Sequence, residues 1–267
     1  MVFFFQSNSW ADVYAVTLFP MLLLFSALII YLYGRHKNNK IMNNSLEQLS
    51  ITFDDVVENF EELNKVAAAR SYTINLIKPK KKDEEEKEEI IDMVSHIQRM
   101  RLHFSCEDRQ FLPSWMFLIF KKSKDFIVLE GDPIIKNDYL NFEVIYFKDL
   151  GKYQLDKFKD ELSDYEDFEP NSKFSAKFIH KTNLPEALRY LYSSDPLIKK
   201  LIYNIKGIHR ISIKRKEDFS VRIVVLINKD IDYKLLKQLT FRLIRAVGQT
   251  NKAINKKPGR YLKSELK

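Results

Sequence analysis

A long apolar run near the N-terminus dominates the hydrophobicity pattern. Residues 13–33 contain no side chain that is charged at neutral pH. A helix rises about 1.5 Å per residue, so this run measures about 30 Å, the thickness of the hydrocarbon core of a bilayer. Aromatic side chains of the kind found at membrane interfaces flank it: Trp10, Tyr14, Tyr31 and Tyr33. The pattern therefore predicts a membrane-spanning helix.

The flanks of the apolar run distinguish a permanent anchor from a cleaved signal. Residues 1–12 contain no basic side chain, whereas Arg35, Lys37 and Lys40 follow the run. A secretory signal has the opposite arrangement, with a basic start and a shorter apolar core. The positive-inside rule predicts a short luminal N-terminus at residues 1–12 and a cytosolic C-terminal flank. The alternative, a buried helix of a soluble protein, fits the length and the lack of charge less well.

Residues 34–123 are predicted to be a mainly helical region. Apolar positions recur with helical spacing in residues 40–68, and the charge run at residues 78–89 is a predicted linker in its first half. Helix is expected to resume through "IIDMVSHIQRM". A second apolar run, "FLPSWMFLIF" at residues 111–120, is too short to cross a bilayer as a helix. A buried core helix is the preferred interpretation, and a re-entrant or membrane-surface segment is the alternative.

From residue 124 onward, short segments rich in β-branched and aromatic residues predict strands. These segments are "DFIVLEG", "YLNFEVIYF", "GIHRISI" and "FSVRIVVLI". Helical spacing occurs in "LGKYQLDKFKDELSDY", and two short helices are expected at "LPEALRYLY" and "SDPLIKKLIYN". Strand–strand–helix order thus occurs twice, at residues 124–163 and 207–254. The predicted fold class is α+β, with an antiparallel or mixed sheet and packed helices in a cytosolic domain at residues 124–230.

The last segment, residues 231–267, predicts a basic amphipathic helix and a tail. At about 100° per residue, the leucines from Leu235 onward fall on one side of the helix. The opposite side holds cations and one aromatic ring, from Lys234, Phe241, Arg245, Lys252 and Lys256, with Lys237 and Arg242 beside them. We expect the apolar side to pack on the sheet and the basic side to remain in water.

Positive charge is concentrated in this last segment. The chain of 267 residues has a formal net charge of +8. From Lys234 to Lys263 there are nine Lys or Arg residues and no Asp or Glu. A solvated helix face usually mixes both signs, so this block indicates an anionic partner, either RNA or acidic lipid headgroups. RNA is the preferred interpretation because the block lies far along the chain from the apolar run.

The sequence contains no recognisable motif of a catalytic, metal or cofactor site. His103, Cys106 and Asp108 lie close together, but one cysteine without a second ligand pair does not fit structural zinc. Phosphate-binding loops, dinucleotide fingerprints and nucleophile elbows are absent. A single thiol is also typical of a reducing compartment. We therefore predict no catalytic residues, no metal and no cofactor, and an enzyme with a dispersed active site is the weakest interpretation.

The order of these parts resembles the calumin family, the coiled-coil-domain-containing endoplasmic reticulum proteins of the PAT complex. The resemblance begins with Ser9-Trp10, Tyr14 and "YLYGRHKNNK" around the apolar run. It continues with "LPEALRYL", "IKGIHRISI" and "VRIVVLINKDIDYKLLKQLTFRLIRAVGQTNKA", and covers most of residues 9–260. The acidic luminal segment and the long C-terminal coiled coil of the family have no counterpart here. We therefore expect a shortened form, and luminal calcium binding is not carried over.

The resemblance implies a non-catalytic subunit of an intramembrane chaperone in the endoplasmic reticulum membrane. Its implied partners are the Sec61 translocon, the ribosome, a small membrane partner of the PAT complex and multipass membrane protein clients. The residues expected to contact ribosomal RNA are Lys234, Arg245, Lys252, Lys256, Lys257, Arg260 and Lys263. Those expected at the membrane interface are Trp10, Tyr14, Tyr31, Tyr33, Arg35 and Lys37. The alternative function is a membrane-tethered module that binds anionic lipid through the basic helix.

Overall fold

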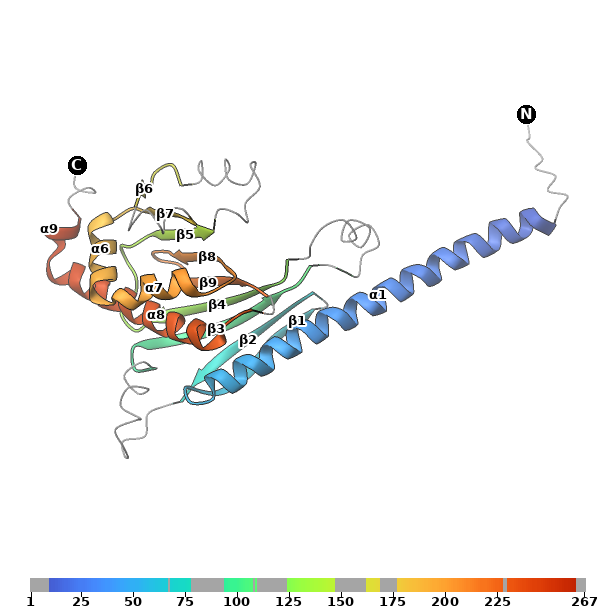
Figure 1. The fold of residues 1–267 in the computed structure, drawn as a ribbon, viewed down its shortest axis with the longest axis horizontal. Helices are drawn as coiled ribbons and strands as arrows, with labels where there is room; N and C mark the ends of the chain where they lie inside the picture. Colours follow the sequence, from blue (N-terminus) through green and yellow to red (C-terminus); the bar gives the residue numbers. More distant parts are fainter. Residues whose placement is uncertain are drawn as a thin grey trace.

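One antiparallel sheet with helices on one face forms the body of the protein (Figure 1). The computed structural model describes residues 10–66, 68–77, 94–107, 109, 124–146, 162–168, 177–227 and 230–262, with side chains from residue 18 onward. The strands are β1 (Val57–Val66), β2 (Ala69–Leu76), β3 (Ile97–Ser105), β4 (Phe126–Pro133), β5 (Phe142–Tyr146), β6 (Glu166–Asp167), β7 (Phe178–Thr182), β8 (Ile208–Ile213) and β9 (Val221–Leu226). The helices are α1 (Trp10–Phe53), α6 (Pro185–Ser194), α7 (Pro196–Asn204), α8 (Tyr233–Lys256) and α9 (Pro258–Tyr261).

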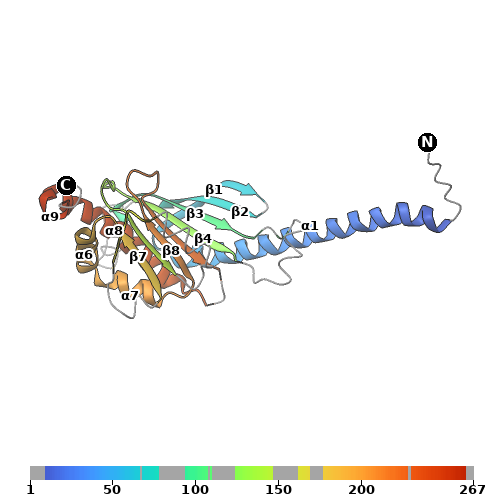
Figure 2. The ribbon, with the colours of Figure 1, turned by 90° about the horizontal axis from the view of Figure 1, so that it is seen from above.

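The nine strands form a single sheet in the order β1-β2-β3-β4-β9-β8-β5-β7-β6. Every pairing is antiparallel, so the predicted α+β class and antiparallel sheet are confirmed. Helix α8 lies across the middle of one face, against β3, β4 and β9, with α1 on one side of it and α6 and α7 on the other. Figure 2 shows the sheet and these helices as two layers. The core lies between the layers.

Helix α1 is continuous from the apolar run into the body of the protein. Within the described chain it is the one helix that is long and apolar enough to cross a membrane. Its first half projects beyond the sheet (Figure 1), whereas its second half carries a buried stripe. The stripe repeats every three or four residues, as one face of a helix does, and consists of Gly34, Asn38, Met42, Ser45, Leu49 and Phe53. The predicted helix within residues 34–123 is therefore correct as far as Phe53.

Among the described residues from 54 to 123 the prediction of a mainly helical region is wrong, because β1, β2 and β3 lie there. β1 lies at the edge of the sheet and is exposed on both faces, so it has no apolar alternation that would have identified it. β3 does alternate: Met100, Leu102 and Phe104 are buried between more exposed polar residues. That period of two was a usable strand signal. β3 also pairs with β4, so one sheet spans the predicted domain boundary at residue 123.

The later elements follow the sequence prediction closely. β5, β8 and β9 lie within predicted strand segments, and β4 begins in "DFIVLEG" but continues two residues beyond it to Pro133. α6 and α7 match the two predicted short helices. Asp195 caps α7 by accepting a hydrogen bond from the backbone N–H of Leu197, and Asp232 caps α8 in the same way. The short strands β6 and β7 were not predicted. The apolar run at residues 111–120 and all but the last four residues of the helix predicted at 150–165 lie outside the described residues; residues 162–165 are described and are not helical.

Two glycines allow α8 to pack closely on the sheet. A Cβ atom at Gly131 of β4 would overlap the side chain of Ile244 on α8. A Cβ atom at Gly248 of α8 would come within 3.0 Å of Pro133 at the end of β4. The middle of α8 is buried where the helix and the sheet approach each other this closely.

Candidate membrane and polyanion interfaces

A buried ion pair joins α1 to the sheet just beyond the apolar run. Arg109 donates to both carboxylate oxygens of Asp125 at 2.8 and 2.7 Å, and also to Oδ1 of Asn38 on α1 at 2.6 Å. Asn38 in turn donates to the backbone carbonyl of Glu107 at 3.1 Å. Asn38 lies little more than one helical turn beyond Tyr33. The end of β3 and the start of β4 are therefore fixed to α1 directly after the candidate span.

A second buried arginine strengthens this junction. Arg70 of β2 donates to the side-chain oxygens of Asn39 and Asn43 on α1, each at 2.6 Å. The asparagines are weak helix formers, and three of them in this part of α1 hold the sheet rather than favour the helix. We call Asn38, Asn39, Asn43, Arg70, Arg109 and Asp125 the junction. Sequence reasoning noted these asparagines only as part of a basic flank.

The N-terminal half of α8 does not present the free basic face that the sequence predicted. Phe241, placed by periodicity among the cations, is fully buried and packs against Phe53 of α1 with ring centroids 5.9 Å apart. Lys237 pairs with Asp55, directly after α1. Arg242 pairs with Asp195 at the start of α7, at 3.0 Å. The prediction failed here because α1 covers a side of α8 that was expected to face water.

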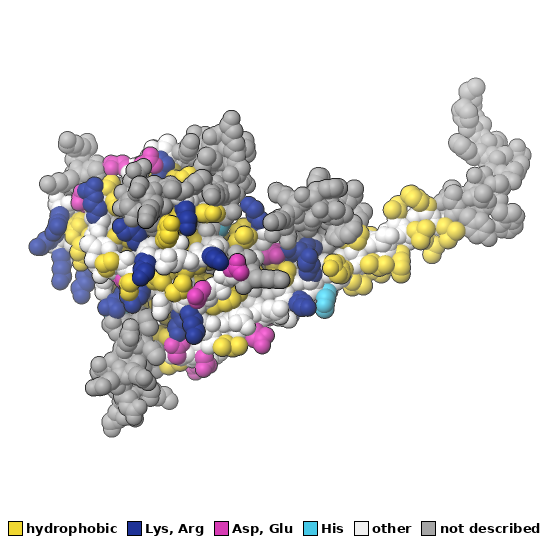
Figure 3. All heavy atoms as spheres, in the orientation of Figure 1, with side chains coloured by type: hydrophobic (Ala, Val, Ile, Leu, Met, Phe, Trp, Pro, Cys, Tyr) yellow, Lys and Arg dark blue, Asp and Glu magenta, His cyan; other side chains and the backbone are white. Residues whose placement is uncertain are grey.

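The C-terminal end of α8 and the adjoining α9, unlike the N-terminal half of α8, do present a free basic surface. Lys252, Lys256, Lys257 and Arg260 are exposed, and none of them has a carboxylate partner among the described residues. We call these four residues the cationic pole. Figure 3 shows blue side chains gathered at this end of the molecule, away from the projecting half of α1. The pole is the part of the predicted basic face that remains in water.

The other residues predicted to contact RNA differ in their surroundings. Lys234 is exposed at the first turn of α8, at the end of the helix opposite to the pole. Arg245 is only partly exposed. Lys263 lies outside the described residues. The structure thus brings four of the seven predicted residues together.

The predicted membrane-interface residues all belong to α1. Tyr31 and Tyr33 are exposed, and Arg35 and Lys37 are exposed one turn further along. Trp10 is the first residue of the helix. Tyr14 also lies in α1, and the side chains of both residues lie outside the described part of the chain. The exposed apolar surface of residues 18–33 ends where this basic flank begins.

The sheet face opposite the helices carries ordered ion pairs that sequence reasoning missed. Glu130 accepts hydrogen bonds from Nε2 of His103 at 2.9 Å and from Arg222 at 2.7 Å. Burial alone would raise the pKa of Glu130, but His103 and Arg222 hold it below its usual value. Further along, Glu143 is held by Arg210 and Ser212. Both carboxylates are buried, so removing their partners would leave an uncompensated charge in the interior.

The residues that superficially suggested a metal site have other partners. His103 bonds Ser71 through Nδ1 at 2.7 Å and Glu130 through Nε2. Cys106 is buried, and burial followed by the charge of Asp125 raises the pKa of its thiol to about 12. The thiol is therefore protonated and unreactive at neutral pH. Among the described residues there is no group of three His, Cys, Asp or Glu side chains that could hold a metal ion.

Neither a comparison with models of known protein families nor a search of curated proteins finds a match to this chain.

Proposed function

We propose that this protein is a single-pass, non-catalytic subunit of an endoplasmic reticulum chaperone that assists the biogenesis of multipass membrane proteins. In this proposal, residues 13–33 span the membrane with the N-terminus in the lumen, and the sheet and its helices lie in the cytosol. The ribosome and the Sec61 translocon are its main partners, with a small membrane subunit and client proteins beside the span. The resemblance to the calumin family supplies this assignment.

The observation that carries the proposal is the position of the cationic pole. Residues 34–53 of α1 extend about 30 Å beyond the candidate span. The end of α8 and α9 lies at the opposite end of the molecule from that span (Figures 1 and 2). The pole has exposed cations, has no carboxylate partner among the described residues, and lies far from the span. Such a surface can bind the phosphates of ribosomal RNA in a ribosome held above the membrane.

The same geometry argues against the alternative in which the basic helix binds anionic lipid. The potential of a charged membrane surface decays over a Debye length of about 8 Å at physiological ionic strength. A pole that lies several such lengths from the span gains little from that potential if the membrane surrounds residues 13–33. Lipid headgroups are therefore the less favoured partner of the pole.

The proposal is tested by reversing the charge of Lys252, Lys256 and Lys257 to Glu in the full chain. We expect the natural protein to copurify with ribosomes at low salt and to lose them at high salt. The reversed variant should lose ribosomes already at low salt. A matched control reverses Lys40, Lys65 and Lys200, which are exposed on α1, β1 and α7.

Three outcomes are informative. Retention of ribosomes by the control but not by the variant supports the proposal, provided that the variant's free energy of unfolding changes by less than about 0.5 kcal/mol per substitution. Equal loss in both variants would show only a net-charge effect and would contradict a role for the pole. Absence of ribosomes and of the translocon from the natural protein at low salt would overturn the proposal.

A further inference from the structure

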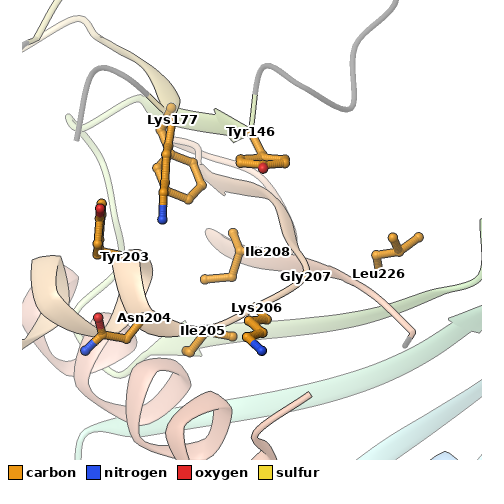
Figure 4. A pocket seen from close by; sticks show the side chains of 10 residues that line it. Tyr146, Lys177, Tyr203, Asn204, Ile205, Lys206, Gly207, Ile208 and Leu226 are labelled. Carbon is orange, nitrogen blue, oxygen red and sulfur yellow. The ribbon is translucent and has the colours of Figure 1, made fainter. Parts of the chain in front are cut away.

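A cavity of about 470 Å³ lies at one end of the sheet, within the size range of small-molecule sites. It lies where β5 and β9 end and where β7 and β8 begin, and α7 closes one side (Figure 4). Tyr146 pairs with Phe178 across two of these strands. The positive φ of 91° at Gly207 allows the sharp turn from α7 into β8 that forms the floor of the cavity.

The cavity opens at the end of the sheet nearest to the candidate span. Leu226 lies opposite Phe126 in the sheet, and Phe126 lies opposite Ser105. These strand ends belong to the same end of the sheet as the junction, where Arg109 holds Asn38. Figure 1 shows β5 and β9 ending on the side from which α1 projects. A lipid headgroup region would lie on this side if α1 crosses a membrane.

The cavity walls combine an apolar floor with an ammonium group. Ile205 and Ile208 are buried, and with Leu226 they form the apolar part. Figure 4 shows Lys177 reaching into the space between Tyr203 and Tyr146. Its Nζ atom lies 3.9 Å from the centre of the Tyr203 ring, a distance at which the ring attracts a cation.

The charge of Lys177 has no carboxylate partner among the described residues. Lys206 at the rim is only loosely paired, 3.7 Å from Asp230, and both side chains are largely exposed. A cation in a mainly apolar, aromatic cavity is stabilised when an anion joins it. A ligand with an anionic group and an apolar part would satisfy both halves of the cavity.

We propose that this cavity binds a phosphorylated amphiphile, with its phosphate at Lys177 and Lys206 and its apolar part against Ile205, Ile208 and Leu226. The shared chemistry is a phosphate monoester on a small carrier such as an inositol ring. A membrane phosphoinositide is the source that the position of the cavity favours, and a soluble inositol phosphate is the other source. This inference is independent of the ribosome contact proposed above.

The test uses the full-length protein in detergent and native mass spectrometry. The probes are a phosphatidylinositol phosphate, phosphatidylcholine and soluble inositol trisphosphate. We expect the natural chain to retain the phosphorylated lipid in preference to phosphatidylcholine. Lys177→Glu should weaken this retention at least about tenfold, the effect of losing one charge-assisted hydrogen bond. Lys200→Glu, an exposed change on α7, is the matched control and should retain the lipid.

The probes also distinguish the two sources. Retention of the lipid but not of inositol trisphosphate identifies a membrane ligand, and the reverse identifies a soluble one. Either result supports the proposal if the Lys177→Glu variant no longer retains the phosphorylated probe. The proposal is overturned if the natural chain prefers neither phosphorylated probe to phosphatidylcholine, or if Lys177→Glu retains them as well as the control does.

A second measurement needs no substitution and therefore holds even if Lys177→Glu fails to fold. An amine-reactive reagent is added to the natural chain with and without the phosphorylated probes, and labelled peptides are identified by mass spectrometry. We expect the probes to slow labelling of Lys177 several-fold and to leave Lys200 unchanged. Equal labelling of Lys177 with and without both probes would overturn the proposal.

Discussion

The junction and the cationic pole use the same kinds of side chain in opposite ways. At the junction, Arg70 and Arg109 are buried; Arg109 is paired with Asp125, and Arg70 donates to the side-chain oxygens of Asn39 and Asn43. At the pole, the cations are exposed and no described carboxylate faces them. One set holds the fold together, and the other set contributes little to it. Charge alone therefore does not identify an interface, because the buried cations of the junction are held by other residues of the chain.

The pairing of Arg109 with Asp125 is essential to the junction. Burial alone would lower the pKa of Arg109, but the hydrogen bonds and the charge of Asp125 raise it above its ordinary value. A buried pair of this kind is weak evidence for net stabilisation, but either member left alone is very unfavourable. The pole residues have no such dependence, since water solvates them in the free protein.

The largest effect is expected from breaking the junction. Arg109→Met leaves Asp125 buried without its partner, and we expect a loss of about 3–5 kcal/mol in the free energy of unfolding. Denaturant-induced unfolding followed by circular dichroism measures this change. Arg109→Met combined with Asp125→Leu should recover most of the loss, because no buried charge then remains unpaired. A loss below 1 kcal/mol in the single variant, taken as about the value for an exposed pair, would contradict the account.

Phe241 tests whether the first half of α8 is truly covered by α1. Phe241→Ala removes a fully buried ring against Phe53 and should cost about 3–4 kcal/mol. If the sequence prediction of an aromatic residue facing water were right, the change would cost less than about 0.5 kcal/mol. The same unfolding experiment therefore decides between the two descriptions of α8.

The sequence alone predicted the helices and strands whose residues follow a clear hydrophobic pattern. The strands around Ile127, Val144, Ile211 and Ile223 alternate or are continuously apolar, and the caps at Asp195 and Asp232 mark two helix starts. These signals are local, so no knowledge of tertiary contacts was needed.

The remainder depended on contacts that are distant in the sequence. Helical periodicity shows that Phe241 lies on the same side of α8 as several cations. It cannot show that Phe53 of α1 covers this side and buries the ring. β1 is an edge strand with helix-forming residues such as Glu61 and Leu63, and its pairing with β2 outweighs their preference. The candidate cavity is lined by the ends of four strands and by α7, and these segments become neighbours only when the sheet and its helices assemble.

Unlike the paired charges, His180 is buried as a neutral side chain, so its contribution to stability depends on pH. Its ring lies beside Phe142 and Tyr192, and burial, followed by the charge of Lys199, lowers its pKa to about 3. The folded protein therefore holds a neutral imidazole that the unfolded chain protonates below about pH 6.5. The stability that His180 contributes is fully present above that pH and is lost as the pH falls towards 3.

Denaturation at pH 7 and pH 5 measures this contribution. We expect the difference in unfolding free energy between the two pH values to be about 2 kcal/mol smaller in His180→Phe than in the natural chain. Carboxylates common to both proteins cancel in this comparison. The same pH dependence in both proteins would contradict a neutral, buried His180.

The smallest effect is expected at the partly exposed ion pair between Lys237 of α8 and Asp55, which follows α1. Lys237 and Asp55 are partly solvated, so their coupling should be only about 0.2–1 kcal/mol. A double-mutant cycle with Lys237→Ala and Asp55→Ala measures it. A coupling of several kcal/mol would show that this pair belongs energetically with the buried junction.

Site-specific crosslinking tests most directly whether the cationic pole contacts RNA. A photoactivatable residue replaces Asn255, which is exposed between the pole residues, and in a control replaces the exposed Gln48 on α1. Both variants are placed in endoplasmic reticulum membranes with bound ribosomes and illuminated. The account predicts ribosomal RNA crosslinks from position 255 that salt removes, and none from position 48. Absence of RNA at position 255, or equal crosslinking at both positions, would contradict it.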